Sequence, residues 1–590
     1  MNETVRYIIA GILIFLILLL TPIYQNWLGY DSRPTVVVED DSKPSELNSV
    51  KNKLSYINDY NLSNTETKNH TNVNNDYHDI IITTIDAPLY TAKISNRSGG
   101  SFVSYKMKNL NSRDKKFSGG YDDDGVFFQN TPTSLILPSN NSCMPCLGQY
   151  DENLETYSYF NQPFTIISTN RSDSISLGLQ DTVSLSYELS NKNGLILRKT
   201  VQFFGDSYFT NHSFVFGDTH TLTNNIELIW ADGLRPTEQK EAEDVQYAKA
   251  SVGQAKEVDK IFMSDANSPN SREVFNGTTD WVSIRTKYFT SAIIIDSPGK
   301  YAALKSNNVV FGGRKHTPVY SAGIGIASNV KSVSSKIYIG PLDVQHLSTT
   351  KYNLDATMDW GIFIIKPISK GILWILKFAH DTFKLNYGVI LLLFAIAIRI
   401  ITGPLTKKSF ESSQNMQKIQ PDLKKIQSKY KSDPSALNRE TMALYKKHGV
   451  NPLGGCLPIL LQMPLLFALF QVFRSTIEFR GAPFILWISD LSKPDVVWAP
   501  AFLKNIWGLN YFFGDGVAVL PIIMGITLML TMRMSSSTMD PSQKPIMYTM
   551  NAFFVLLFNT FPSGLNLYYT AYNILSFFQQ RSIRHGLADK

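Results

Sequence analysis

Five apolar stretches in the last third of this 590-residue chain constrain its fold more than any other feature. They cover 387–405, 453–473, 517–534, 546–561 and 563–579, and each is about long enough to cross a bilayer. A sixth apolar stretch, 7–28, follows Arg6 and spans roughly 30 Å at about 1.5 Å per residue. The pattern predicts a polytopic α-helical membrane protein with six transmembrane helices, five of them in a core at 387–580.

The first stretch, within 1–28, has two interpretations. We expect an N-terminal transmembrane anchor, because no small-x-small cleavage site follows it; the alternative is a cleaved signal peptide. Residues 29–79 are rich in Asn, Ser, Asp and Lys and are predicted to be a disordered tether.

Residues 80–350 have a different pattern and predict a large all-β domain. Short β-rich runs recur between turn signals, for example at 89–94, 182–187, 201–204 and 292–295. Alternation and close turn spacing favour an antiparallel β-sandwich. A helical pattern near 238–250 interrupts it.

The distribution of basic residues predicts the orientation. The segment 407–450, between the second and third spans, contains ten Lys and Arg against four Asp and Glu, whereas the next loop contains four of each. The positive-inside rule therefore places 407–450 and both termini in the cytoplasm, and the β domain outside.

The segment 407–450 has its own helical pattern. Five apolar residues are spaced by three and four and predict one helical stripe: Met416, Ile419, Leu423, Ile426 and Tyr430. Asp433 and Pro434 begin a second helix, whose apolar side includes Tyr445. The sequence predicts a cytoplasmic helical hairpin, either a solvated charged face or a surface that receives substrates or docks partners.

Residues 355–380 are apolar but are interrupted by Lys366, Pro367, Lys370 and Lys377. This pattern fits an amphipathic helix lying in the membrane interface better than a spanning helix.

Arg399 lies inside the second span, about 10 Å from its basic end. An arginine in hydrocarbon costs roughly 2.5 kcal/mol or more, so it marks a functional site or reaches the headgroups by snorkelling. The other spans carry uncharged polar groups, among them Gln462, Gln471, Thr527, Thr531, Asn559, Asn566 and Asn573. We predict that several of them face Arg399 across a wet groove.

The remaining motifs exclude several classes of protein. There is no Walker loop, no G-x-S-x-G and no H-E-x-x-H, so no nucleotide-driven motor or hydrolase is indicated. Cys143 and Cys146 are a C-x-x-C pair between β segments without the helix that a redox motif requires. A local disulfide or a free pair is therefore favoured over a redox site, and no Cys/His cluster has metal-ligand spacing.

Several short motifs resemble the YidC/Oxa family of membrane protein insertases. They are N-P-L-G-G-C-L-P at 451–458 with Q-M-P at 462–464, G-P-L-T-K at 403–407, M-A-L-Y-K at 442–446, F-P-S-G-L at 561–565 with Tyr568 and Tyr569, and Y-I-G-P at 338–341. The match covers most of 80–584 and is strongest over 355–580.

This resemblance implies a bacterial inner-membrane insertase or chaperone that is not an enzyme and needs no cofactor. It implies a periplasmic β-supersandwich and a hydrophilic groove that releases hydrophobic segments laterally into the bilayer, alone or with the Sec translocon. We expect the groove to contain Arg399, Gln462, Thr527, Thr531, Asn566, Tyr568 and Tyr569. The expected partners are newly made inner-membrane proteins, the Sec translocon and lipid, with no nucleic acid. Ribosome contact is left open, because the cytoplasmic tail, 581–590, is short.

Two other classes of protein remain to be weighed. A secondary transporter would need intramembrane acids or an internal repeat, and the spans contain neither. A membrane-anchored sugar-binding or sugar-modifying protein would need paired carboxylates or histidines in one pocket of the β domain.

Overall fold

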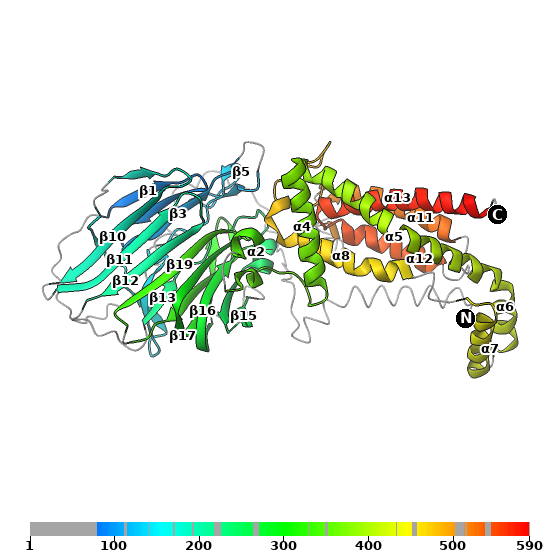
Figure 1. Cartoon of the computed structure of the whole chain (residues 1–590), viewed down its shortest axis with the longest axis horizontal. Helices are drawn as coiled ribbons and strands as arrows, with labels where there is room; N and C mark the ends of the chain where they lie inside the picture. The colour runs from blue at the N-terminus through cyan, green and yellow to red at the C-terminus, as the bar shows by residue number, and fades with distance from the viewer. Residues whose placement is uncertain are drawn as a thin grey trace.

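The computed structural model describes residues 80–110, 115–139, 141–168, 172–191, 194–217, 226–255, 257–263, 271–328, 330–348, 352–431, 433–450, 457–500, 502, 512–513, 516–536 and 544–588. The predicted anchor and tether lie outside these residues. Figure 1 shows a β-rich body and a bundle of helices at opposite ends of an elongated molecule, with helix α4 between them.

The β body is built mainly from two sheets. The small sheet contains β1 (Ile82–Asp86), β2 (Tyr90–Ser95), β3 (Ser101–Met107) and β9 (Ser174–Ser176), in the order β3-β2-β1-β9. The large sheet has thirteen strands: β6 (Cys146–Asp151), β7 (Thr156–Tyr159), β8 (Thr165–Ile166), β10 (Thr182–Asn191), β11 (Gly194–Phe204), β12 (Phe209–Phe216), β13 (Ile226–Trp230), β14 (Lys249–Gln254), β15 (Glu257–Ile261), β16 (Arg272–Arg285), β17 (Phe289–Phe311), β18 (Arg314–Gly325) and β19 (Ser332–Pro341).

The large sheet runs in the order β7-β6-β13-β18-β17-β19-β12-β11-β10-β8, with β16 on β17 and β14 on β16 and β15. Its strand pairs are antiparallel, whereas β1 and β9 pair in parallel. Two short hairpins complete the strands: β4 (Ser118–Tyr121) with β5 (Phe127–Pro132), and β20 (Val496–Trp498) with β21 (Val517–Ala518).

The two main sheets pack face to face. The ring of Phe102 on β3 lies 6.0 Å from that of Phe203 on β11 and 6.3 Å from that of Trp230 on β13. All three side chains are buried, because residues of one parity on each strand point inward. The four predicted β runs fall on β2, β10, β11 and β17, so the prediction of a mainly β-sheet domain is confirmed.

The predicted helix near 238–250 is shorter in the structure. It forms α2 (Glu241–Tyr247) and ends where Lys249 begins strand β14. Pairing of β14 with β15 and β16 supplies the backbone hydrogen bonds that a longer helix would otherwise have made.

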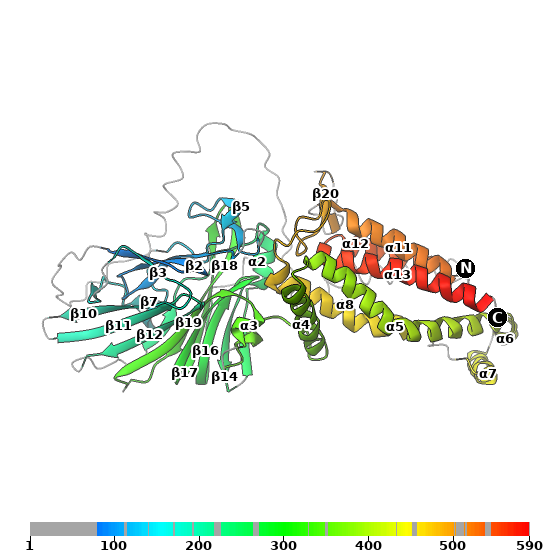
Figure 2. The same cartoon turned by 45° about the horizontal axis from the view of Figure 1, so that its top comes forward.

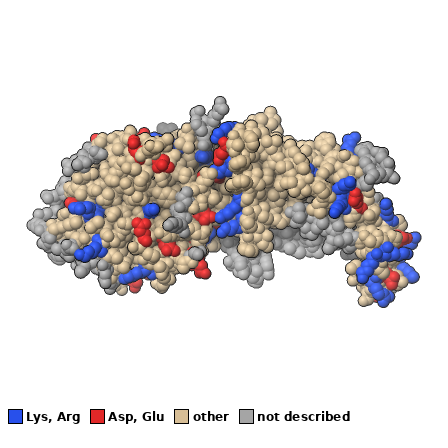
Figure 3. All heavy atoms as spheres, viewed as in Figure 1, with Lys and Arg blue, Asp and Glu red and all other residues tan. Residues whose placement is uncertain are grey.

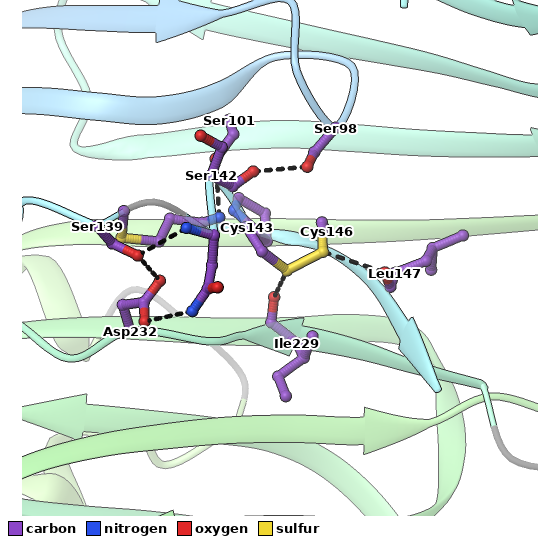
Figure 4. Close-up of a disulfide and its surroundings, with 12 residues drawn as sticks. Ser98, Ser101, Ser139, Ser142, Cys143, Cys146, Leu147, Ile229 and Asp232 are labelled. Atoms are coloured by element: carbon purple, nitrogen blue, oxygen red, sulfur yellow. Dashed lines mark hydrogen bonds between the residues drawn. A yellow bond between two sulfur atoms is a disulfide. The ribbon is translucent and has the colours of Figure 1, made fainter. Parts of the chain in front are cut away.

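Cys143 and Cys146 form a disulfide that is buried in a small cluster with Ile229, against which Tyr157 and Tyr159 pack. Figure 4 shows it joining the loop before β6 to the first residue of β6, beside Ile229 of β13. Neither cysteine begins a helix, and both are within 1% of complete burial. Of the alternatives that the sequence left open, the structure therefore contains the local disulfide.

Lys199 is a charged residue at an inward position of β11, between the inward Leu197 and Val201. Its Nζ donates hydrogen bonds to the carbonyl oxygens of Ser98, at 3.1 Å, and Pro145, at 2.9 Å. Burial disfavours the charged ammonium and lowers the pKa of Lys199 from 10.5 to about 7.

The helices of the bundle are α5 (Tyr387–Lys418), α8 (Leu457–Ser475), α11 (Val519–Ser536), α12 (Lys544–Phe558) and α13 (Ser563–Ala588). Each begins within four residues of the start of a predicted core span. Among the described residues, one helix is long and apolar enough to cross a bilayer, Tyr387–Met416, with two shorter apolar helices at Val519–Arg533 and Met547–Phe558. The number of transmembrane helices therefore stays a prediction.

Two of these helices extend beyond their predicted limits. Pro404 lies inside α5 without ending it, and α5 continues for 14 residues past it, to Lys418. The hydroxyls of Thr402 and Thr406 donate to carbonyl oxygens four residues earlier along this stretch. Helix α13 likewise runs to Ala588, so the predicted tail at 581–590 is largely a continuation of this helix.

Three further helices lie outside the bundle. Helix α4 (Ile365–Phe383) crosses the end of the bundle that faces the β body, transverse to α5 and α8 (Figures 1 and 2). Helices α6 (Gln420–Lys429) and α7 (Pro434–Lys447) lie side by side at the opposite end. Short turns, α3 (Val344–Leu347) and η3 (Leu354–Thr357), lead from β19 toward α4.

A buried arginine joins the bundle to the β body. Arg480, just after the turn η4 (Ile477–Phe479), is 5% exposed, and its Nε lies 2.8 Å from Oε1 of the fully buried Glu238. Its other nitrogens donate to carbonyl oxygens of Lys116, Ser118, Gly119 and Thr237. Lys377 of α4 adds a second contact, to Asp343 at 3.0 Å and to Glu478 at 3.5 Å.

We expect replacement of Lys199 with Met to change how stability depends on pH. Because the folded pKa is about 7 and the unfolded value 10.5, the unfolded chain binds more protons between these values. The free energy of unfolding should therefore rise with pH across this window, by up to about 1.4 kcal/mol per unit, in the wild type but not in Lys199→Met. Urea unfolding of the full chain in detergent at pH 7 and pH 9 measures this.

The matched control is Lys336→Met, at an outward position of β19. It should keep the wild-type dependence on pH. Equal slopes for the wild type and Lys199→Met would contradict the prediction.

Arg480→Ala should destabilise the junction between bundle and β body by about 3 kcal/mol, since it leaves the Glu238 carboxylate buried without its closest cation. Thermal unfolding of the full chain in detergent is the measurement. The double variant Glu238→Ala/Arg480→Ala should lose less than the two single losses added together. Arg198→Ala, which breaks an exposed pair with Glu188, is the control and should cost about 1 kcal/mol or less.

Candidate substrate site in the helical bundle

Arg399 lies in the bundle interior, three turns into α5, and is only 6% exposed. Its Nη1 donates to the hydroxyl of Tyr572 on α13, at 3.1 Å, and its guanidinium lies 5.2 Å from the centre of that ring. Among the described residues, no acceptor lies within hydrogen-bond distance of its buried Nε and Nη2. The guanidinium thus has donors available for an anion or water.

Three tyrosines of α13 form an aromatic cluster beside this arginine. The ring of Tyr568 lies 6.0 Å from Tyr572 and 5.0 Å from Tyr569, and Phe394 of α5 approaches Tyr568 to 5.8 Å. The hydroxyls of Tyr568 and Tyr569 are buried and have no partner among the described residues. Arg399, Tyr568 and Tyr572 therefore share one polar interior region between α5 and α13.

Thr531, one turn after Thr527 on α11, belongs to a second contact, between α11 and α13. Both are half-buried on α11, and the Thr531 hydroxyl lies 3.4 Å from the carbonyl oxygen of Asn573. Asn573 directly follows Tyr572, so Thr531 contacts the same part of α13 from α11, whereas the Thr527 hydroxyl donates to the carbonyl oxygen of Met524 within α11. Asn551 of α12 donates to the carbonyl of Gly525, which brings a third helix to this seam.

Asn566 lies at the first turn of α13 and is fully buried. Its side-chain amide donates to the carbonyl oxygens of Phe558, at 3.1 Å, and Phe561, at 3.3 Å. These contacts hold the tight turn between α12 and α13. Asn566 therefore lies about one and a half turns from Tyr572, towards the β-body end of the bundle.

The two glutamines of α8 lie in different places. Gln462 is half-buried near the start of α8, whereas Gln471 donates to the backbone carbonyl of Asp359 at the junction with the β body. Asn559 is also remote from Arg399, because it accepts from Ala518 N and donates to the carbonyls of Phe512 and Gly516. Gln471 and Asn559 are therefore not among the several polar residues predicted to face Arg399.

Tyr572 is the residue of this site that the sequence did not single out. It lies one turn after Tyr568, and the spacing of four residues from Tyr568 could have indicated a shared helix face. Asn551 and Ser576, both buried, were also missed, because an isolated polar residue in an apolar stretch does not reveal which neighbour it faces.

Three pockets in the described part of the chain lie around the β body, α4 and the end of α8. Arg399 lines none of them. The hydrophilic groove therefore stays a prediction, supported by the buried polar groups.

The predicted stripe at 416–430 is divided between two helices. Met416 lies on α5, Ile419 precedes α6, Leu423 and Ile426 lie on α6, and Tyr430 follows its last residue. The expectation of one continuous helix is wrong because Pro421 lacks a backbone N–H and clashes with the preceding turn. Leu423 and Ile419 are nonetheless buried, so both apolar side chains still pack inward.

The second helix of this region begins as predicted. The side chain of Asp433 caps α7 by accepting hydrogen bonds from the backbone N–H groups of Ser435 and Ala436. Tyr445 lies near its end and is half-buried. Figure 3 shows Lys and Arg gathered over α6 and α7, whereas the visible face of the bundle is almost free of charge.

Two family models match the chain. The one described as "60Kd inner membrane protein" matches residues 378–590, and the one described as "YidC periplasmic domain" matches residues 162–375.

Curated relatives match most of the chain. A protein of Chlorobium limicola named "Membrane protein insertase YidC" is 32% identical over 85% of this chain and 82% of its own length. A protein of the same name from Chlorobaculum parvum is 30% identical over 86% and 83%. The solved structure "Active YidC insertase crystal structure with the first transmembrane domain resolved" is 16% identical, covers 85% of this chain and 94% of that chain, and has a TM-score of 0.33.

Tyr572→Phe should lower the free energy of unfolding by about 1.5 kcal/mol, since the Arg399 guanidinium loses a hydroxyl acceptor while the aromatic ring stays. A double-mutant cycle with Arg399→Gln, read by thermal unfolding in nanodiscs, should give a coupling energy of at least about 0.5 kcal/mol. Tyr569→Phe, whose ring packs against Phe558, is the control and should show no coupling. No coupling between Arg399 and Tyr572 would contradict the contact.

Proposed function

Because the chain belongs to the YidC family of membrane protein insertases, we propose that it receives hydrophobic segments of new proteins in a hydrophilic groove around Arg399 and releases them sideways into the bilayer. Members of this family are not enzymes, which excludes the sugar-modifying alternative and leaves the chain without a catalytic residue. The observation that carries the proposal is one buried guanidinium with donors unfilled by the described residues.

The family indicates the inner membrane and a periplasmic β domain, and we propose the rest of the topology. Six spans, formed by the predicted anchor at 1–28 and by α5, α8, α11, α12 and α13, place both termini in the cytoplasm. The basic helices α6 and α7, within 407–450, then form the cytoplasmic hairpin. Two features support this assignment: these helices lie at the opposite end from the β body, and the 474–498 loop with balanced charge lies at the β-body end.

The charge of Arg399 has a specific role in this proposal. An acidic residue held at membrane depth costs about 2.5–3.5 kcal/mol. A guanidinium about 4 Å away returns about 4 kcal/mol at an effective dielectric constant of 20. The two terms nearly cancel, so a short acidic segment can pass through the site without being trapped in it.

Release into lipid needs an apolar surface next to the polar site. Met463 and Phe467 on α8 are 37% and 52% exposed, and Ile574 and Phe578 on α13 are 40% and 60% exposed. We propose that the apolar helix of the substrate slides along α8 and α13 while its polar end stays near Arg399. Burial of about 20 apolar residues in the bilayer provides the driving force, at roughly 25 cal/mol per Å².

Substrate proteins and the bilayer are the partners that the family implies. We further propose contact with the Sec translocon and with the ribosome, the latter through the basic surface of α6 and α7 with Ile426 and Tyr445. No cofactor enters this proposal.

Arg399→Ala should reduce insertion of a single-span substrate with an acidic outer segment by about tenfold, equivalent to losing about 1.4 kcal/mol of attraction. When each acid of this substrate is replaced by Gln, Arg399→Ala should insert it nearly as well as the wild type does. Arg399→Lys keeps the charge and should retain most insertion. Protease protection in reconstituted vesicles reads out the inserted fraction.

Lys336→Ala, at an outward position of β19 and outside the bundle, is the control for general loss of positive charge. Equal losses for the acidic and neutral substrates would remove the charge-attraction role of Arg399.

A further inference from the structure

A pocket of about 530 Å³ lies where the β body, the start of α4 and the end of α8 meet. Its cations come from three separate elements: Lys260 from β15, Lys366 from α4 and Arg474 from α8. Trp360 and Gln471 also line it, and Gln471 donates to the carbonyl oxygen of Asp359.

Positive charge exceeds negative charge around this pocket. Asp359 is the one acid among its described lining residues, and cations already surround it: Lys249 at 2.8 Å, Arg285 at 3.5 Å and Lys260 at 3.8 Å. Lys366 and Arg474 add two further positive charges to the lining. One carboxylate is thus shared among cations from several elements.

The pKa values of Asp359, Lys249 and Lys260 agree with this excess of positive charge. Burial alone would raise the pKa of Asp359. Arg285 and Lys249 favour its charged form, however, and lower this pKa to about 2. Burial, together with repulsion from Arg285, lowers the pKa of Lys249 to about 8 despite its contact with Asp359. Burial and repulsion from Arg285 and Lys366 likewise lower the pKa of Lys260.

The pocket opens beside residues that suit the edge of a bilayer. Ile362 lines it and is 70% exposed, and the next two residues, Phe363 and Ile364, are 90% and 62% exposed. Further along α4, Trp374 and Phe378 are also exposed, and the helix lies transverse to the bundle (Figure 1). Such side chains enter the boundary between headgroups and acyl chains when a helix lies in the membrane plane.

We propose that this pocket binds the phosphate headgroup of an anionic phospholipid from the leaflet on the β-body side. Lys260, Lys366 and Arg474 would hold the phosphate oxygens, while Ile362 and Phe363 contact the start of the acyl chains. Charge-assisted hydrogen bonds to phosphate are among the strongest that proteins make. A bound headgroup would link β15, α4 and α8.

A lipid suits the pocket better than an acidic peptide from a substrate. The pocket is bordered by exposed apolar side chains of α4, which a lipid covers with its own acyl chains and a soluble acidic segment would leave in water. Its volume is in the range of small-molecule sites and suits a phosphoglycerol headgroup.

Native mass spectrometry of the full chain, released from detergent with defined lipids, tests the proposal. The wild type should retain phosphatidylglycerol in preference to phosphatidylcholine. Lys260→Gln/Lys366→Gln should weaken phosphatidylglycerol retention about tenfold, and the milder Lys366→Gln should weaken it about threefold. Lys384→Gln removes a charge at the far end of α4, outside the pocket, and should bind like the wild type.

Each other outcome overturns the assignment. If inorganic phosphate protects the wild type against heat as well as phosphatidylglycerol does, and the lipid shows no preference, the ligand is a free anion. If the wild type retains no lipid and an acidic peptide crosslinks to the pocket, the ligand is a protein segment. If both lysine variants retain lipid as the wild type does, the pocket binds no headgroup.

Discussion

A bilayer core offers no hydrogen-bond partners, and this constraint accounts for the arrangement of the helical bundle. Each helix of the bundle satisfies its own backbone, and its polar side chains must find partners on neighbouring helices. Asn551 reaches the backbone of α11, Asn566 holds the turn before α13, and Arg399 reaches the hydroxyl of Tyr572. Helix α13 is central because α5 and α11 both pack polar residues against it. Around Arg399 this pairing is incomplete, because buried polar atoms of Arg399, Tyr568 and Tyr569 have no partner among the described residues.

The lack of hydrogen-bond partners in the bilayer no longer applies where the bundle meets the β body. Buried charged residues occur there. Arg480, Lys377 and Lys249 each reach a carboxylate across the boundary between bundle and β body. Such pairs are stable only when geometry and additional hydrogen bonds compensate for lost hydration, as the four carbonyl groups around Arg480 do. The junction thus contains both buried ion pairs and a cationic pocket.

Prediction from the sequence was most accurate where one physical period dominates. Alternation identified strands β2, β10, β11 and β17, and long apolar runs identified the five bundle helices to within four residues at their starts. It was less accurate where two effects compete. The stripe from Met416 to Tyr430 has helical spacing throughout, yet Pro421 divides it, and α5 passes through Pro404, which lacks a backbone N–H. The helix expected at 238–250 was shortened because a neighbouring strand offered the same backbone groups a partner.

The sequence by itself determined the family, the mainly β-sheet domain and the unusual charge at position 399, because periodicity, short motifs and a charge in an apolar run are local properties. Only the tertiary structure decided which side chains meet. It placed Tyr572 against Arg399, removed Gln471 and Asn559 from that site, closed Cys143 and Cys146 into a disulfide, and gathered Lys260, Lys366 and Arg474 from three distant segments. Contacts of this kind depend on how helices rotate and sheets align in space, and the spacing of residues along one chain does not contain that information.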